Sequence, residues 1–252
     1  MMNRSNIRSR LKNAIFIFIW LLIWELADRM IDNPILLSGP LETLRRLFSL
    51  IPEESFRLSV LMSLSRIMAG FFLSAVLAVI LGSISYFLPL IREFLSPFIS
   101  LMKAIPVASF VILALICLHG SRDLSLVVTF IVTFPLIWDS VISGLSSSDQ
   151  KLLELSEVFH MNMPSRLRYI YVPAVLPYLS SSLSSVMGMA WKSGVAAELI
   201  GQPKDTIGFY LYQSKVFLDT TGVLAWTFTV ILLSYVCERL LALLIRLLSK
   251  ML

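Results

Sequence analysis

Residues 60–90, VLMSLSRIMAGFFLSAVLAVILGSISYFLPL, decide the class of fold, and Arg66 is their only charged residue. A spanning helix needs about 20 mostly apolar residues, so this run is long enough to cross a bilayer. Comparable runs lie on both sides of it, at residues 14–27, 94–118, 124–145, 175–200 and 223–248. The sequence therefore predicts an all-α membrane protein with about six transmembrane helices.

The composition excludes a typical soluble enzyme. Hydrophobic residues make up 57% of the 252 residues and charged residues 15%, against about 45–50% and about 25% in soluble domains. The two cysteines, Cys117 and Cys237, both lie inside apolar runs, which argues against a disulfide framework or a Cys-rich metal site. The net charge of +5 comes from scattered Lys and Arg residues, so we expect flanks of membrane helices and no nucleic-acid partner.

The basic residues also suggest a topology. Arg4, Arg8, Arg10 and Lys12 precede the first apolar run, and no small-residue cleavage site follows it. We interpret this run as an uncleaved span with its N-terminus inside, which places eleven of the 21 basic residues in inner segments and seven in outer ones. On this basis residues 1–58 form the first transmembrane helix and an external segment with an amphipathic helix from Pro40 to Phe48. Residues 59–252 form the main transmembrane domain.

The inner segment, residues 146–173, is the most informative connection. Leu152, Leu155 and Phe159 recur at helical spacing, and Pro164 interrupts this helix but suits the first turn of another. The pattern predicts two short helices outside the bilayer. Their apolar face would fit a groove on a soluble partner, or the segment is a plain surface connector.

This segment resembles the coupling loop of the membrane subunits of bacterial ATP-binding-cassette (ABC) importers. That loop reads Glu-Ala-Ala, three residues, Gly, nine residues, and Ile-x-Leu-Pro. The matching positions here are Glu154, Leu155, Ser156, His160, Ile170, Val172 and Pro173.

Leu155, His160 and Val172 depart from the pattern by replacing Ala, Gly and Leu, and the small residue Ser156 replaces the second Ala. The Gly position suits a positive φ at the end of the first helix, where His pays a steric cost. Asn162 is the alternative residue for that turn.

Three other stretches are similar to the nitrate, sulfonate and taurine branch of this family: residues 63–71, residues 103–108, and residues 191–201 with Ile207 and Gly208. The resemblance implies a type I ABC importer permease fold in the bacterial inner membrane. It also implies a second permease copy, two ABC ATPase subunits, an extracytoplasmic substrate-binding protein and surrounding membrane lipid. The solute would be small and polar or anionic, such as a sulfonate, nitrate, taurine or a thiamine precursor.

The resemblance further implies a subunit that is not an enzyme and binds no cofactor, with ATP and Mg on the partner ATPase. The chain agrees with that expectation, because it contains no G-x-x-x-x-G-K-[ST] phosphate loop. His119 and His160 are far apart and lack neighbouring ligands at metal-binding spacing, so we expect no metal site.

Lys192 and Glu198 are the candidate pathway or gate residues, because ionisable residues inside a span are costly and often functional. They are six residues apart and so lie on different helix faces. Lys192 would meet an anionic cargo, and Glu198 would help to close an outer gate. The alternative is that they reach the membrane surface or pair with a partner subunit.

Two other classes of membrane protein stay open as alternatives. A secondary transporter would need midplane coupling carboxylates and often shows inverted repeats with broken helices. We see neither feature, although Pro106 and Pro135 interrupt two of the expected spans. A membrane-embedded enzyme would need clustered His, Asp or Glu residues, and the charged residues here are dispersed.

Overall fold

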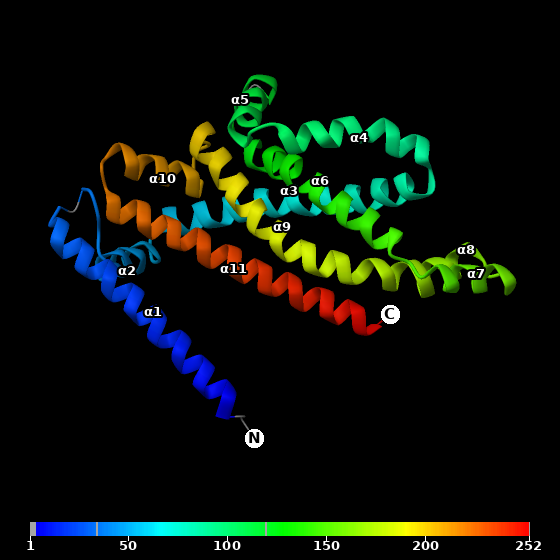
Figure 1. The fold of residues 1–252 in the computed structure, drawn as a ribbon. Coiled ribbons are helices and arrows are strands. Elements are labelled where there is room, and N and C mark those ends of the chain that lie inside the picture. Colours follow the sequence, from blue (N-terminus) through cyan, green and yellow to red (C-terminus); the bar gives the residue numbers. More distant parts are fainter. Residues whose placement is uncertain (1–3, 34, 119, 252) are drawn as a thin grey trace. The chain divides into compact units, whose positions relative to one another are not determined.

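A computed structural model describes residues 4–33, 35–118 and 120–251, and the regular elements in these ranges are helices (Figure 1). In chain order they are α1 (Arg4–Ile31), α2 (Pro40–Leu50), α3 (Glu54–Phe87), α4 (Pro89–Ala104), α5 (Val107–Leu118), α6 (Leu124–Ser146), α7 (Gln150–Val158), α8 (Met163–Arg166), the π-helical turn η1 (Leu167–Tyr171), α9 (Val172–Gly201), α10 (Ile207–Val216) and α11 (Thr220–Met251). The all-α membrane fold is confirmed.

Four of the described helices are long and apolar enough to cross a membrane: Glu54–Phe87, Leu124–Ser146, Met163–Gly201 and Thr220–Leu247. A fifth expected span, residues 94–118, is a pair of helices, α4 and α5, and the chain bends by 108° between them. Pro106 lies at this break, as its lack of an N–H group predicts. Pro135 does not interrupt α6, which continues through it.

The first expected span is one uninterrupted helix, α1, but it does not reach the apolar length of the others. Between Lys12 and Glu25 only residues 13–24 are free of charge. At about 1.5 Å per residue this stretch covers about 18 Å, well short of a hydrocarbon core of about 30 Å. By length and composition, the described residues contain four apolar spans, or five if the bent pair crosses the membrane as one span.

The chain forms two compact units, which divide it differently from a single boundary at residue 58. The first unit comprises residues 1–57 together with 210–229, and the second comprises residues 58–209 and 230–252. The boundary predicted at residue 58 could not group residues 210–229 with the first segment, because more than 150 positions of the chain separate them.

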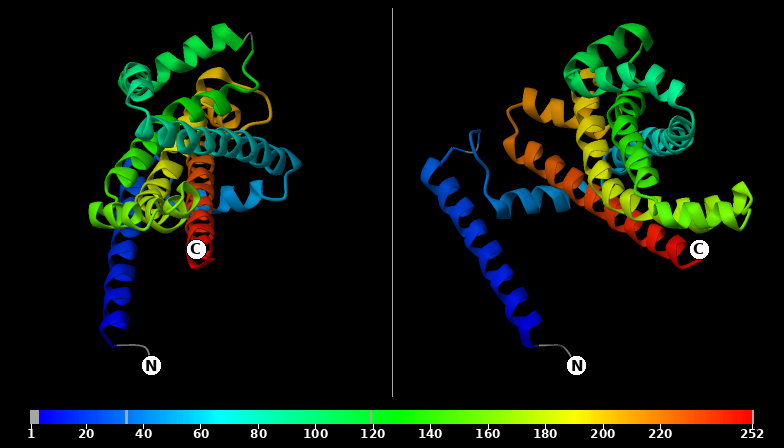
Figure 2. Two further views of the ribbon diagram at one scale, coloured as in Figure 1. Left: turned by 90° about the vertical axis from the view of Figure 1, so that its right-hand side faces the viewer. Right: turned by 45° about the vertical axis from the view of Figure 1, so that its right-hand side comes forward.

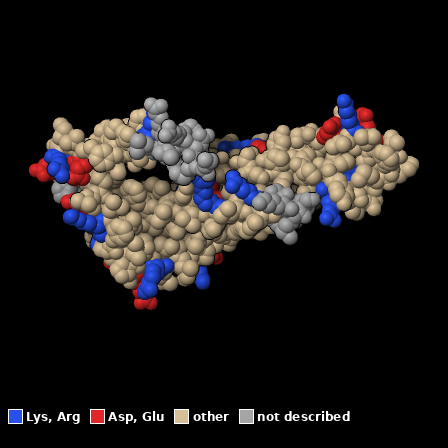
Figure 3. All heavy atoms as spheres, turned by 90° about the horizontal axis from the view of Figure 1, so that it is seen from below, with Lys and Arg blue, Asp and Glu red and all other residues tan. Residues whose placement is uncertain are grey.

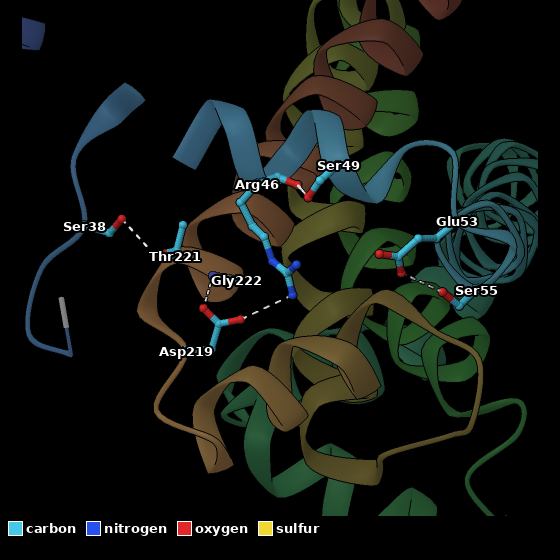
Figure 4. Close-up of polar contacts among 8 residues, drawn as sticks. All are labelled: Ser38, Arg46, Ser49, Glu53, Ser55, Asp219, Thr221 and Gly222. Atoms are coloured by element: carbon cyan, nitrogen blue, oxygen red, sulfur yellow. Dashed lines mark hydrogen bonds and ion pairs between the residues drawn. The ribbon is translucent and has the colours of Figure 1, made fainter. Parts of the chain in front are cut away.

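Polar contacts join the parts of the first unit (Figure 4). Arg46 on α2 forms an ion pair with Asp219, at 3.6 Å between Nη2 and Oδ2. Asp219 also accepts a hydrogen bond from the Gly222 N–H at 2.8 Å, which caps the start of α11. Ser38 accepts from the Thr221 hydroxyl at 2.9 Å. The expected amphipathic helix, α2, is thus fixed to the turn between α10 and α11.

The core of the second unit is the pair α6 and α9, which lie side by side in both views of Figure 2. Small residues allow this close approach. A Cβ atom added at Gly144 on α6 would lie 2.8 Å from the Cα atom of Val175 on α9. Trp191 on α9 and Ile137 on α6 are fully buried here. The chain leaves α6 at Ser146 and enters α9 at Val172, so the α7 turn lies between the two helices of this pair in the sequence.

Candidate functional site: the coupling segment and the buried Glu198 cluster

The helix α7 begins and ends at well-defined caps. Asp149 accepts a hydrogen bond from the Lys151 N–H at 2.9 Å and so caps the N-terminus. At the other end the His160 N–H donates to the Glu157 carbonyl, and the Met161 N–H donates to the Ser156 carbonyl. These two bonds are those of a Schellman motif, which needs a left-handed residue between them.

His160 is that left-handed residue, with a φ of 50°. The structure therefore assigns the positive φ to the position where the importer pattern has Gly. Asn162 does not take the turn, since its φ is −69°. It caps α8 instead, by accepting from the Ser165 N–H at 3.0 Å.

The turn after α7 is held by one arginine. Arg166 donates from Nε to the Met161 carbonyl at 3.1 Å and from Nη2 to the Ser156 carbonyl at 3.4 Å. Its Nη1 lies 3.7 Å from Glu157. These contacts tie α7 to α8.

The prediction of two separate short helices is wrong for the second one. The helix that starts at Met163 continues through η1 into α9, and the described span runs from Met163 to Gly201. In η1 the Val172 N–H donates to the Leu167 carbonyl, five residues earlier. This wider turn comes directly before Pro173, whose ring would crowd the carbonyl of Tyr169 in an α-helix. The π-turn therefore accommodates Pro173, and the helix continues without a break.

One face of α7 is apolar and exposed. Its members and their exposed fractions are Leu152 (47%), Leu155 (50%), Val158 (73%) and Phe159 (75%). At about 100° per residue they fall within about 120° of the helix circumference. In Figure 3 both signs of charge gather at the right-hand end of the surface, where α7 and α8 lie in Figure 1. An apolar face beside charged residues is typical of a protein-docking surface.

The seven residues of the expected coupling pattern divide into exposed and buried groups. Glu154, Leu155, His160 and Pro173 are exposed, whereas Val172 is partly buried. Ser156 and Ile170 are buried, with 1% and 7% of their surface exposed. The buried Ser156 donates to the Leu153 carbonyl at 2.6 Å. Glu154, Leu155 and His160 are thus available to a partner, and Ser156 and Ile170 support them.

The two expected pathway residues occupy different environments, although both lie on α9. Lys192 is exposed. Glu198 is fully buried, with none of its surface exposed. Helical spacing had placed them on different faces, and the structure agrees with that placement.

Glu198 joins α9 to α3 and to the start of α10. Its Oε2 accepts from the Ser63 hydroxyl at 2.7 Å and from the Gly208 N–H at 3.2 Å. Ser63 in turn accepts from the Ile207 N–H at 2.9 Å. Two free N–H groups at the N-terminus of α10 are therefore capped by side chains of other helices.

Glycine is needed for this contact, because a Cβ atom at Gly208 would lie 2.3 Å from the Cβ of Glu198 and 2.5 Å from the N of Leu199. Sequence reasoning missed Ser63 as a partner of Glu198, since 135 residues separate them. No local pattern connects two residues at that distance.

Ser125 and Arg66 also lie near the Glu198 carboxyl group. Within the described part of the chain, Glu198 Oε1, Ser125 Oγ and Arg66 Nη1 are buried without a hydrogen-bond partner. No group of three or more His, Cys, Asp or Glu side chains in the described ranges could hold a metal ion. His119 lies outside these ranges.

Comparison with known proteins gives the family. The family described as "Binding-protein-dependent transport system inner membrane component" matches residues 74–250. The chain belongs to this family. The matched region contains α7, the π-turn and the whole of α9, so it includes the coupling segment, Lys192 and Glu198. The protein is therefore a permease component of an ABC importer, a membrane subunit of a non-catalytic family.

Curated relatives of this permease have several cargoes in their names. It is 24% identical over 230 residues to the taurine transport system permease protein TauC of Escherichia coli (strain K12), covering 89% of this chain and 82% of that protein. It is 25% identical to the formylaminopyrimidine transport permease protein ThiX of Halalkalibacterium halodurans, covering 88% of each. It is 22% identical to the nitrate import permease protein NrtB of Leptolyngbya laminosa, covering 83% and 77%.

A solved structure shares the fold. It is a bacterial ABC transporter involved in the import of the acidic polysaccharide alginate, matched with a TM-score of 0.59 and 15% identity over 99% of this chain and 98% of that chain. Its similarity supports the type I permease fold that the coupling-loop resemblance implied.

Proposed function

We propose that this permease carries a small polar or anionic solute across the bacterial inner membrane, as a dimer with a second permease copy. Two ABC ATPase subunits bind ATP and Mg on its cytoplasmic side, and an extracytoplasmic binding protein delivers the solute. The chain itself binds no cofactor. The relatives named for taurine, nitrate and formylaminopyrimidine support this class of cargo.

The exposed apolar face of α7 is the observation that carries the proposal. Leu155 and Phe159 would leave large apolar areas in water unless a partner covers them. The α7 face fits a groove on the ATPase, and the Arg166 contacts pass its movement to α8 and α9. With α1 as the first span, α7 is cytoplasmic and the N-terminus is inside.

The partner contact is tested by Leu155→Glu, with Gln150→Glu as the matched control. Both variants add one carboxylate to exposed positions of the same helix, but Gln150 lies on the side opposite the apolar face. Burying an unpaired charge at an interface costs several kcal/mol. We expect Leu155→Glu to lose the ATPase on co-purification and Gln150→Glu to retain it. Equal retention by both variants would contradict a docking role for α7.

The cargo is tested with the complex of this permease, its ATPase and its binding protein in proteoliposomes. Radiolabelled taurine, nitrate and bicarbonate are offered outside, with ATP and Mg on the ATPase side. We expect uptake of at least one of them that requires both ATP and the binding protein. Uptake that follows an ion gradient without ATP would refute the proposal in favour of a secondary transporter.

A further inference from the structure

The helix α4 carries a polar stripe along a membrane-depth segment. The stripe consists of Arg92, Ser96, Ser100 and Lys103, and all four residues are exposed. At about 100° per residue they fall within about 80° of the circumference. The other side of α4 exposes apolar residues, among them Phe94 (69%) and Leu101 (56%). The apolar side of α4 is thus compatible with lipid, and the polar stripe is compatible with water.

The stripe ends at an exposed ion pair. Lys103 on α4 contacts Asp139 on α6, and their side chains are 39% and 44% exposed. Asp139 precedes the end of α6 at Ser146 by about 10 Å, at about 1.5 Å per residue. It therefore lies within the apolar thickness that a spanning helix crosses. Charged side chains at this depth face a water-filled cavity or protein rather than lipid.

The backbone next to Lys103 gives a separate indication. Helix α4 ends at Ala104, and Pro106 has no N–H group for the carbonyl of Met102. Ala104 and Pro106 are both exposed at this break. Irregular backbone at membrane depth is tolerated where it is buried in protein or lines water. Since Ala104 and Pro106 are exposed, this break fits backbone that lines water rather than backbone buried within the subunit.

A helix lying flat on the membrane surface is a poorer explanation of the same stripe. Ile99 is 3% exposed, and Lys103 contacts a residue in the interior of the spanning helix α6. The C-terminal half of α4 is therefore beside the spanning helix α6, about 10 Å from its end, where a helix lying flat on the membrane surface would not reach.

From these observations we infer that the α4 polar stripe lines the water-filled cargo pathway of the permease. Lys103 meets the anionic group of the cargo there, and Asp139 is the counter-ion that holds Lys103 when cargo is absent. This inference rests on the proposed function, because it assigns the pathway of that same transporter.

The test compares two neighbouring positions, Ser100→Cys on the stripe and Leu101→Cys on the apolar side. Cys117→Ala and Cys237→Ala first remove the native thiols, and the complex is assembled in proteoliposomes. The probe is the charged, membrane-impermeant thiol reagent MTSES, which reacts with thiols in water. We expect the Ser100→Cys variant to react at least tenfold faster than Leu101→Cys and to lose ATP-dependent taurine uptake once modified. We also expect its rate to change at least threefold after trapping with ATP and orthovanadate.

Equal reaction rates at the two positions would overturn the inference, because the stripe would then face lipid or a neighbouring subunit. A fast rate that does not respond to trapping would also overturn it and favour a helix on the membrane surface. If the thiol-free parent complex transports but the Ser100→Cys variant does not react, this inference fails alone. If the parent shows no ATP-dependent transport, the proposed function fails and this inference fails with it.

A charge series tests the role of Lys103. We expect Lys103→Met to raise the KM for taurine uptake about tenfold while the complex still assembles, and Lys103→Arg to restore most of the loss. If Lys103 had a structural role, kcat and assembly would fall with unchanged KM, and that result would refute contact with cargo.

Discussion

Glu198 offers the sharpest prediction, because its two variants separate the loss of an acceptor from the loss of a charge. In Glu198→Ala, the Gly208 N–H and the Ser63 hydroxyl lose their shared acceptor in a fully buried site. A buried donor left unpaired costs about 1–3 kcal/mol, so two donors give about 2–6 kcal/mol. In Glu198→Gln, the amide oxygen keeps both bonds, and its NH₂ group can donate to the unpaired Ser125 hydroxyl. We expect a loss below about 1.5 kcal/mol for that variant.

The assay is unfolding of the purified permease in mixed micelles by SDS titration. Tryptophan fluorescence reports the transition, because Trp191 is fully buried on the same helix. Ser63→Ala is the companion variant, which unpairs the Ile207 N–H and should cost about 1–3 kcal/mol. The reasoning is refuted if Glu198→Gln destabilises the protein as much as Glu198→Ala, or if Glu198→Ala costs less than about 1 kcal/mol. A stable Glu198→Gln permease that no longer transports would instead support the gate role predicted for Glu198.

Four further substitutions test single positions. Gly208→Ala should destabilise the same SDS transition by more than about 2 kcal/mol, because its Cβ meets backbone atoms of α9. Gly188→Ala has no atom within 4 Å of the new Cβ and should gain up to about 1 kcal/mol; equal effects at the two glycines would contradict the packing argument. His160→Gly should stabilise the α7 turn by about 1 kcal/mol, seen as slower amide exchange in α7, and faster exchange would count against the strain at this residue. Lys192→Met should reduce uptake and leave assembly and basal ATPase activity intact, and unchanged uptake kinetics would assign Lys192 a structural role.

Several features of this protein could be read from the order of its residues. Apolar runs such as residues 60–90 identify spanning helices, because the bilayer requires about 20 apolar residues whatever their partners are. The turn at the end of α7 was also predicted from the coupling pattern, although the sequence left His160 and Asn162 as alternatives for the left-handed residue, and the structure has it at His160. The break at Pro106 was predicted from its missing N–H group, although the same argument failed at Pro135, which lies inside α6. These are local properties, set by residues near each other in the chain.

Tertiary structure decided what depends on distant residues. The sequence showed that Glu198 is an ionisable residue in a span, but its partner Ser63 lies 135 positions away, and the helix end that it caps forms only when α3, α9 and α10 meet. The second short helix was expected to stop before the span, whereas the π-turn carries the chain past Pro173 into α9. Likewise, the sequence shows that the residues of the α4 stripe are three or four positions apart. Only the structure shows that they are exposed and that Lys103 contacts Asp139. Periodicity fixes which residues share a helix face, whereas the packing of other helices decides whether that face meets protein, lipid or water.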